Sequence, residues 1–249
     1  MQLCARKCPV FTPPQVSAHT DVLTGYAKDE TLLPASSSGA VFPVLAAEII
    51  QRGGIVFGAA FDKNFDVIHT AAETLSELTA LCSSKYVQSR IPADCYSQVK
   101  KALSDGRWVY FSGMPCQVAA LKNYLGKEYA TLITQDTACH SVPSPMVWKD
   151  YVAALEKQHS GKLTSFSFRN KVNGWEAIIS VLNLTTARNS GSLPQKIPIS
   201  ADSSKGYIPA VRASRADLRV LSAAAISRWP IIGVSKAFSR RLIIRREHL

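Results

Sequence analysis

Apolar and polar positions follow two regular periods between residues 20 and 175. From Ala40 to Arg52 the apolar residues recur at the three- and four-residue spacing of an amphipathic helix, and Gly53-Gly54 follows as a helix-ending pair. A nearly continuous apolar run from Ile55 to Phe61 comes next, as is typical of a buried strand. This stretch therefore predicts a helix that leads directly into a strand.

The alternation of strand and helix continues toward Trp175. Thr74 and Glu77 stand three residues apart, which is the capping-box pattern that begins a helix. Further strands are expected at 66–70, 107–112, 130–135 and 163–168, and further helices at 94–104, 115–125 and 145–158. This order predicts an α/β fold, with a mixed or mostly parallel sheet flanked by helices.

Both periods disappear after Trp175, where Ser, Arg and Ala are scattered without turn signals. We expect an irregular or disordered C-terminal tail there. The net charge of +11 lies mainly in this tail, since residues 1–175 carry 17 Lys+Arg against 14 Asp+Glu (17 − 14 = +3) and residues 176–249 carry 12 against 4 (12 − 4 = +8). A basic nucleic-acid-binding module is one interpretation of such a segment.

The overall composition indicates a globular protein. The chain has 249 residues, 47% of them hydrophobic, which is enough for one sizeable core or two small ones. No run approaches the roughly 20 apolar residues of a membrane helix, so we expect a cytoplasmic protein without membrane insertion. The six cysteines are too sparse for a disulfide scaffold, which favours reduced thiols, catalytic thiols or cluster ligands.

Two loops at predicted strand-to-helix junctions have the composition of ligand-binding loops. Ser36, Ser37, Ser38 and Gly39 precede the helix at 40–52, where free N–H groups and the helix dipole favour a phosphate. Taken alone, the motif is explained more simply by serines that only cap the helix. The second loop follows the strand expected at 107–112, and its candidate residues are Gly113, Pro115, Cys116 and Gln117. It lies at the carboxyl end of that strand, which is where ligands of open α/β sheets bind.

The thiols at this edge leave several chemistries open. A helix dipole would lower the pKa of Cys116, although a small buried cysteine is the simpler interpretation. Cys139 and His140 follow another strand, and residues 82–85, including Lys85, could join them from a neighbouring loop. A Cys116–His140 hydrolase dyad lacks an orienting third residue. A zinc site that used Cys82 as well would lack the usual C-x2-4-C pair.

A cysteine pair near the start matches part of a ferredoxin motif. Cys4, Cys8 and Pro9 reproduce the end of C-x2-C-x2-C-x3-C-P, whereas Met1 stands where another ligand would be. We therefore expect residues 1–19 to be a truncated remnant of a 4Fe-4S domain, with at most two ligands.

Six segments together resemble the coenzyme F420 hydrogenase/dehydrogenase beta subunit family, in the bacterial form with N-terminal ferredoxin motifs. The segments are SSSGAVF (36–42), GGIVFGAAFD (53–62), SKYVQS (84–89), FSGMPCQVAALK (111–122), DTACHSVPSPMVW (136–148) and SFRNKVNGW (167–175). The family usually has SSSGG, GTPCQ and CHGVPS, where this chain has Ala40, Met114 and Ser141.

The resemblance implies an oxidoreductase subunit that relays electrons between iron-sulfur clusters, a flavin such as FAD, and an acceptor. Residues 20–175 would be the cofactor-binding domain, with the candidate residues named above facing the cofactor. The expected partners are an electron-donor protein and coenzyme F420 or another small acceptor, with no nucleic acid. We expect no 4Fe-4S cluster in this chain, and an inactive pseudogene fragment is the alternative.

The family pattern should continue beyond Trp175 but is missing as written. With permissive codon choice in one shifted frame, 183–199 yields FDNGEEFGKPAAENPYF, 211–216 yields PCIPC and 225–236 yields DISLADYWGVE. These are family-like segments in the correct order. They favour a frameshift between Trp175 and Asn183, which would make residues 176–249 an aberrant basic tail and remove the main support for nucleic-acid binding.

Overall fold

A computed structural model describes residues 2–13, 23–137, 139, 141–171, 179–186, 189–198 and 242–246. Its helices are α1 (Gln2–Lys7), α2 (Leu32–Ala35), α3 (Val41–Gln51), α4 (Leu75–Leu81), α5 (Cys95–Ser104), α6 (Pro115–Leu125) and α7 (Pro145–His159). Its strands are β1 (Leu23–Ala27), β2 (Ile55–Phe61), β3 (Val67–Ala72), β4 (Val109–Gly113), β5 (Leu132–Asp136), β6 (Gly161–Asn170), β7 (Ile179–Thr186), β8 (Asn189–Pro198) and β9 (Leu242–Arg246).

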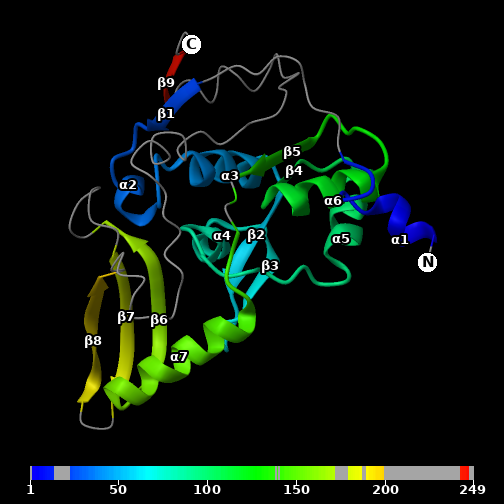
Figure 1. Ribbon diagram of the computed structural model, residues 1–249. Coiled ribbons are helices and arrows are strands. Elements are labelled where there is room, and N and C mark those ends of the chain that lie inside the picture. The colour runs from blue at the N-terminus through cyan, green and yellow to red at the C-terminus, as the bar shows by residue number, and fades with distance from the viewer. Residues whose placement is uncertain are drawn as a thin grey trace.

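A four-stranded mixed sheet forms the centre of the molecule (Figure 1). Its strand order is β3-β2-β4-β5, in which β2, β4 and β5 are parallel and β3 pairs antiparallel with β2. Parallel neighbours need a crossover, and the helices α5 and α6 lie in the crossovers that lead to β4 and β5. The predicted α/β fold class, a mostly parallel sheet with flanking helices, is confirmed.

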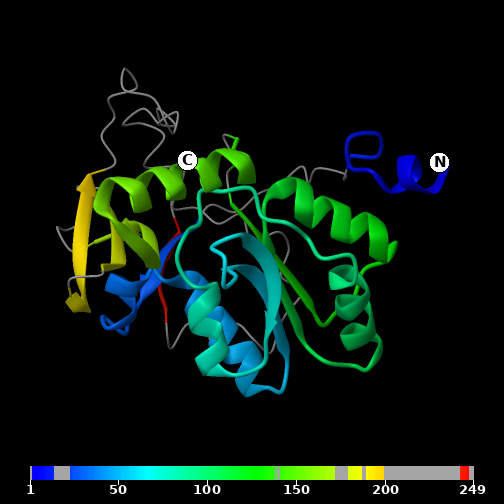
Figure 2. The ribbon, with the colours of Figure 1, turned by 90° about the horizontal axis from the view of Figure 1, so that it is seen from below.

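Helices cover both faces of this sheet, which gives three layers (Figure 2). Val56 and Tyr110 are fully buried in the core beneath α3 and α4. Phe57 and Phe111, one position further along the same strands, are buried in the core beneath α5 and α6. Because successive strand residues point to opposite faces, a strand covered on both faces is apolar throughout, as the sequence of β2 is.

Local end signals set the helix limits as predicted. Thr74 and Glu77 form a complete capping box at the start of α4, with Glu77 N donating to Thr74 Oγ1 at 3.2 Å and Glu77 Oε2 accepting from Thr74 N at 3.1 Å. Pro115 occupies the first turn of α6, and Gly126 ends that helix in the left-handed conformation. The predicted helices at 115–125 and 94–104 are confirmed to within one residue.

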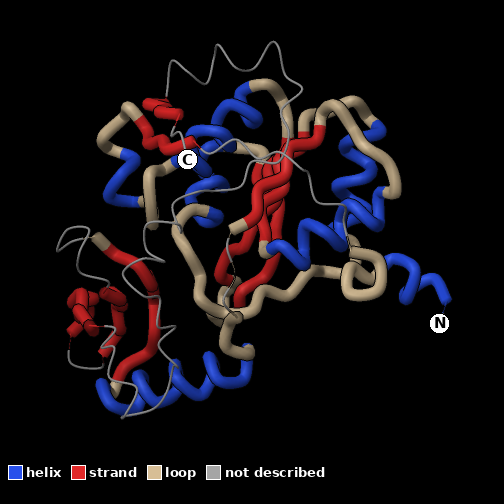
Figure 3. The backbone as a smooth tube through the Cα atoms, turned by 45° about the horizontal axis from the view of Figure 1, so that its top comes forward, coloured by secondary structure: helices blue, strands red, loops and turns tan. Residues whose placement is uncertain are grey.

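The strand predicted at 163–168 belongs to a second sheet. β6, β7 and β8 form a separate antiparallel sheet that packs on α7 (Figure 3), in a core that also includes Phe61 of β2 and Val67 of β3. Trp148 of α7 is buried there, its ring centroid 5.0 Å from that of Phe166 and 5.1 Å from that of Phe168. The apolar alternation of this strand predicts its buried face and not which sheet it joins.

Regular structure extends beyond Trp175, where the sequence predicts a tail without it. Leu182 and Leu184 of β7 are buried in the same core as Trp148, on the inward face of the strand. β9 pairs antiparallel with β1, far away in the sequence. The remainder of the tail, including 211–216 and 225–236, lies outside the described residues. No helix in the described part of the chain is long and apolar enough to cross a membrane.

Candidate cofactor site at the carboxyl edge of the central sheet

The carboxyl ends of the parallel strands form the edge at which the candidate residues meet. Gly113 at the end of β4 is paired in register with Asp136 at the end of β5. Helix α3 leads into β2 through Gly53 and Gly54 and packs on it, so the α3 N-terminus lies toward the carboxyl end of β2. The serine loop (residues 36–39), which precedes α3, therefore lies toward the same edge as the 113–117 loop.

A single segment, residues 84–89, connects these two loops. At one end, Ser84 N donates to Ser37 Oγ at 2.7 Å. At the other end, Gln117 Nε2 donates to Ser89 Oγ at 2.8 Å. Gln88 N also donates to Pro143 O at 3.1 Å, which joins the segment to the loop that follows Cys139. Hydrogen bonds thus link four parts of the chain that are separate in the sequence, namely residues 36–39, residues 84–89, residues 113–117 and the loop that follows Cys139.

Lys85 lies inside this connecting segment, and its ammonium group points at the end of α4. Its Nζ donates to Ala80 O at 2.9 Å and to Cys82 O at 2.7 Å. Burial lowers the pKa of Lys85 to about 8, against the smaller opposing effect of Cys82. The amine therefore caps free carbonyls of α4, and one of its three N–H bonds is not accounted for by these two contacts.

Lys171 is a second cation at the serine loop and was missed in the sequence. Its Nζ donates to Leu33 O at 2.9 Å and to Ser38 O at 2.8 Å. Burial, followed by repulsion from Arg169, lowers the pKa of Lys171 to about 8. Lys171 belongs to the SFRNKVNGW segment, but nothing local shows that it reaches a loop more than 130 residues earlier.

Gly39 allows the serine loop to lie directly against β1. A Cβ on Gly39 would come within 2.6 Å of Gly25 O and 3.2 Å of Tyr26 Cα. The close approach permits Ala27 N to donate to Gly39 O at 2.8 Å. Gly39 is therefore required by backbone proximity, a reason distinct from the cofactor contact that the sequence predicts.

Gln117 has a structural role at the start of α6. Its Oε1 accepts from Met114 N at 2.9 Å, while its backbone carbonyl accepts from Tyr96 Oη at 3.0 Å. Gly113 lies against the same side chain, since a Cβ there would be 3.1 Å from Gln117 Oε1. The amide of Gln117 thus fixes the first turn of α6 relative to residues 84–89 and orders this part of the edge.

His69 of β3 contacts the same edge, and it too was not selected from the sequence. It is 3% exposed on the edge strand β3, and its Nε2 lies 3.0 Å from Ser112 O. The ring stacks on Phe111 at 5.4 Å between centroids. Nδ1 is buried without a hydrogen-bond partner among the described residues, and burial lowers the pKa of His69. A histidine at a buried position of a mostly apolar strand, VIHTAA, is the signal that would have found it.

The described cysteines differ in exposure, with Cys8 and Cys82 half-buried and Cys95 buried. Cys116, in the first turn of α6, and Cys139 are exposed, while burial raises the pKa of Cys82 and raises that of Cys95 to about 11. His140 lies outside the described residues. Within the described part of the chain no group of three or more His, Cys, Asp and Glu side chains could hold a metal, which gives the Cys82-based zinc interpretation no support there.

The two N-terminal cysteines belong to a short helical segment. Cys4 lies in α1, and Cys8 directly follows that helix. A 4Fe-4S cluster takes four cysteine ligands, and this segment has two. The two cysteines of this described segment therefore do not make up a complete cluster site.

The three departures from the family pattern each have a conformational consequence. Ala40 has φ = 60° and Ser141 has φ = 84°, in the left-handed region that a glycine adopts without strain. Met114 is the N-cap residue of α6, where a side-chain hydroxyl such as that of Thr satisfies a free N–H group. A glycine at positions 40 and 141 and a hydroxyl side chain at position 114 would therefore suit these backbone conformations better.

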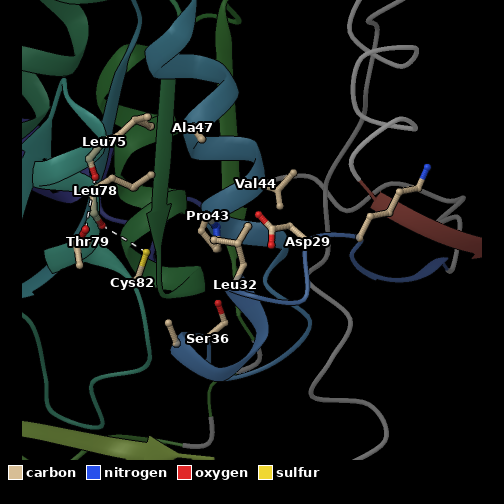
Figure 4. Close-up of a pocket in the computed structure, with 12 residues that line it drawn as sticks. Asp29, Leu32, Ser36, Pro43, Val44, Ala47, Leu75, Leu78, Thr79 and Cys82 are labelled. Atoms are coloured by element: carbon tan, nitrogen blue, oxygen red, sulfur yellow. Dashed lines mark hydrogen bonds between the residues drawn. The ribbon is translucent and has the colours of Figure 1, made fainter.

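A separate, mainly apolar cavity of about 590 Å³ opens between α2, α3 and α4 (Figure 4). Pro43, Val44 and Ala47 of α3 lie opposite Leu75 and Leu78 of α4. Its other lining residues are Lys28, Asp29, Leu32, Ala35, Ser36, Thr79 and Cys82. The volume is in the range of small-molecule sites, but of the candidate residues selected in the sequence only Ser36 and Cys82 line it.

The fold and the linked loops thus define a mixed α/β protein with a polar, loop-built edge at the carboxyl ends of its parallel strands. No family model matches the sequence, and no curated protein matches it either. Among solved structures, one similar chain belongs to the F420-reducing [NiFe] hydrogenase complex from Methanosarcina barkeri. The identity is 19% and the TM-score 0.45, over 76% of this chain and 64% of that chain. This protein therefore spans less than two thirds of that chain's length.

Proposed function

We propose that this chain is a flavin-binding subunit of an oxidoreductase and binds FAD at the carboxyl edge of the central sheet. The observation that carries the proposal is the 84–89 segment, which is hydrogen-bonded to the serine loop through Ser84 and to the 113–117 loop through Ser89. A preformed frame of this kind holds two candidate ligand-binding loops in a constant relation without a ligand.

The serine loop has the chemistry of a pyrophosphate site. α3 is an 11-residue helix, so its N-terminal N–H groups and dipole favour an anion. Ser37 Oγ accepts a hydrogen bond from Ser84 N and keeps its own proton to donate to a phosphate oxygen. The Lys171 ammonium is hydrogen-bonded to Ser38 O in this loop and adds positive charge there. The Lys85 ammonium is bonded to Cys82 O, two residues before Ser84, which donates to Ser37 Oγ.

The 113–117 loop would hold the other part of the cofactor. Gln117 and His69 fix this loop through Met114 N and Ser112 O, so its backbone is already ordered. A bound flavin would supply the electron chemistry, and the residues of this chain would bind it, orient it and exclude water. None of them needs to act as an acid or a base, and Cys116 and Cys139 are exposed beside the loops.

The electrons would come from a redox partner protein. An electron-donor protein on one side and coenzyme F420 or another small acceptor on the other complete the proposed relay. A chain that folds but neither binds a flavin nor takes part in this relay would be the inactive fragment that its sequence also allows.

An anaerobic titration of the full chain with FAD, followed by flavin fluorescence, tests the proposal. We expect saturable binding, and we expect Ser37→Ala to weaken it about tenfold, since a hydrogen bond to a charged group is worth roughly 1.5–3 kcal/mol. Ser104→Ala is the matched control, because Ser104 Oγ donates only to Lys100 O on the distant helix α5. Thermal melts of both variants check folding. A folded chain without saturable FAD binding would overturn the proposal.

A further inference from the structure

The first described segment folds back on α6 and is held there at both ends. Asn123 Nδ2 donates to Lys7 O at 3.2 Å and to Thr12 O at 2.9 Å. Within the loop, Phe11 N and Thr12 N donate to Cys8 O at 3.1 and 2.8 Å. Figures 1 and 2 show α1 and this loop at the margin of the molecule, beside α6. The loop is therefore a braced structure rather than a simple extension of the chain.

The braced loop exposes large apolar side chains. Val10 is 80% exposed and Phe11 is 74% exposed, and Tyr124, which follows Asn123 on α6, is 41% exposed. The hydrogen bonds that hold the loop use backbone groups, Asn123 and the Thr12 hydroxyl, so neither the Val10 nor the Phe11 side chain is needed to fix it. Adjacent exposed apolar side chains on an ordered loop are typical of the centre of a protein interface.

The surroundings of these side chains are strongly basic. Residues 5–13 and 122–128 contain four basic residues and one acidic one, namely Arg6, Lys7, Lys122, Lys127 and Glu128. The Lys7 ammonium lies beside Gly126, 3.3 Å from where a Cβ on that glycine would be. Lys100 adds a further cation, with its Nζ 6.0 Å from the centre of the Tyr124 ring. Interfaces pair such a rim with charges of the opposite sign.

We propose that this surface, the N-terminal patch formed by residues 6–13 and 122–127, binds a second protein that presents an apolar pocket ringed by carboxylates. A second copy of this chain that used the same patch would bring cations against cations, which disfavours a symmetric dimer here. The inference rests on the proposed function in one respect: the partner is an acidic electron-carrier protein.

The test uses an acidic bacterial ferredoxin as the probe and the full chain without flavin, measured by isothermal titration calorimetry. We expect saturable micromolar binding that weakens as salt increases, because exposed charges at a rim are screened. Phe11→Ser should weaken binding about tenfold or more, as loss of a central aromatic anchor does. Lys7→Glu should weaken it as well. The control is Met146→Ser, which removes a 70% exposed apolar side chain on α7.

Two outcomes would overturn the inference. One is an absence of saturable binding by the folded chain, and the other is an equal effect of Phe11→Ser and Met146→Ser. Light scattering of the chain alone adds a third check, since concentration-dependent self-association lost in Phe11→Ser would assign the patch to a dimer instead. Because the probe is titrated without flavin, these results are independent of FAD binding at the sheet edge.

Discussion

His69 Nε2 lies 3.0 Å from the carbonyl oxygen of Ser112 and joins the edge strand β3 to the carboxyl end of β4. A carbonyl only accepts, so Nε2 carries a proton. Because burial lowers the pKa of His69, the ring is neutral at pH 7 and Nδ1 is bare. That Nδ1 is buried without a partner among the described residues, and an unpaired buried acceptor costs about 1–3 kcal/mol. The contact therefore maintains the position of the 113–117 loop at a cost to stability.

This histidine should make stability fall with acidification. The pKa of His69 in the folded protein lies below its ordinary value, mainly because of burial. Below about pH 6.5 the unfolded chain therefore binds a proton at this residue that the folded chain does not bind. The free energy of unfolding should therefore decrease from pH 7.5 to pH 5.5, as urea midpoints would show. His69→Gln should reduce this decrease. Equal pH dependence in wild type and His69→Gln would contradict the assignment.

Replacing Gly39 with alanine should destabilise the protein. The added methyl would meet the backbone of β1 at Gly25 O, 2.6 Å away, and a backbone atom cannot rotate aside. We expect a loss of about 1–3 kcal/mol in the free energy of unfolding, the usual cost of overpacking. Gly58→Ala is the matched control, since its nearest contact would be an ordinary 3.6 Å from Leu81 Cβ. A cost for Gly39→Ala no greater than that for Gly58→Ala would disprove the close approach.

Ser141→Gly should stabilise the loop that follows Cys139. Ser141 has φ = 84° and is exposed, so glycine relieves the strain without emptying a packed space. The left-handed conformation costs a non-glycine residue about 1–2 kcal/mol, which glycine would recover. The greater conformational freedom of glycine in the unfolded chain offsets about 0.4–1 kcal/mol of this gain. A net gain near 0.5 kcal/mol should raise the thermal midpoint.

A nearby serine provides the opposite result as a control. Ser144 caps α7 by accepting from Val147 N at 3.4 Å, so Ser144→Ala should cost about 1 kcal/mol. Stabilisation by both substitutions, or by neither, would show that backbone strain at Ser141 is not the cause.

The FAD affinity of the full chain should fall as pH rises through about 8. Lys171 has a pKa of about 8, so it is charged at pH 7 and neutral at pH 9, when its attraction for a phosphate is lost. We expect severalfold weaker binding at pH 9 than at pH 7 by fluorescence titration. Lys171→Arg keeps its charge over this range and should lessen the loss. Lys162→Arg, on an exposed lysine paired with Glu156, should behave as wild type. An unchanged loss in Lys171→Arg would exclude Lys171 as the titrating group.

The candidate site was only partly visible in the sequence. Loops 36–39 and 113–117 could be selected because glycine, proline and serine at strand-to-helix junctions carry their meaning locally. The roles of Gly39 and Gln117 could not, since they depend on contacts with β1 and with Ser89. Lys171 and His69 escaped notice because their partners are distant in sequence.

The sequence by itself determined the elements that depend on local signals: strand β2 from its apolar run, α4 from its capping box, and α6 between Pro115 and Gly126. It also determined the fold class, because strands and helices that alternate along a chain have few ways to pack. Tertiary structure alone decided the rest. Side-chain periodicity shows which face of a strand is buried and not which strand lies beside it. The antiparallel β3, the separate β6–β8 sheet and the bracing of residues 6–13 by Asn123 all arise from contacts between residues far apart in the chain.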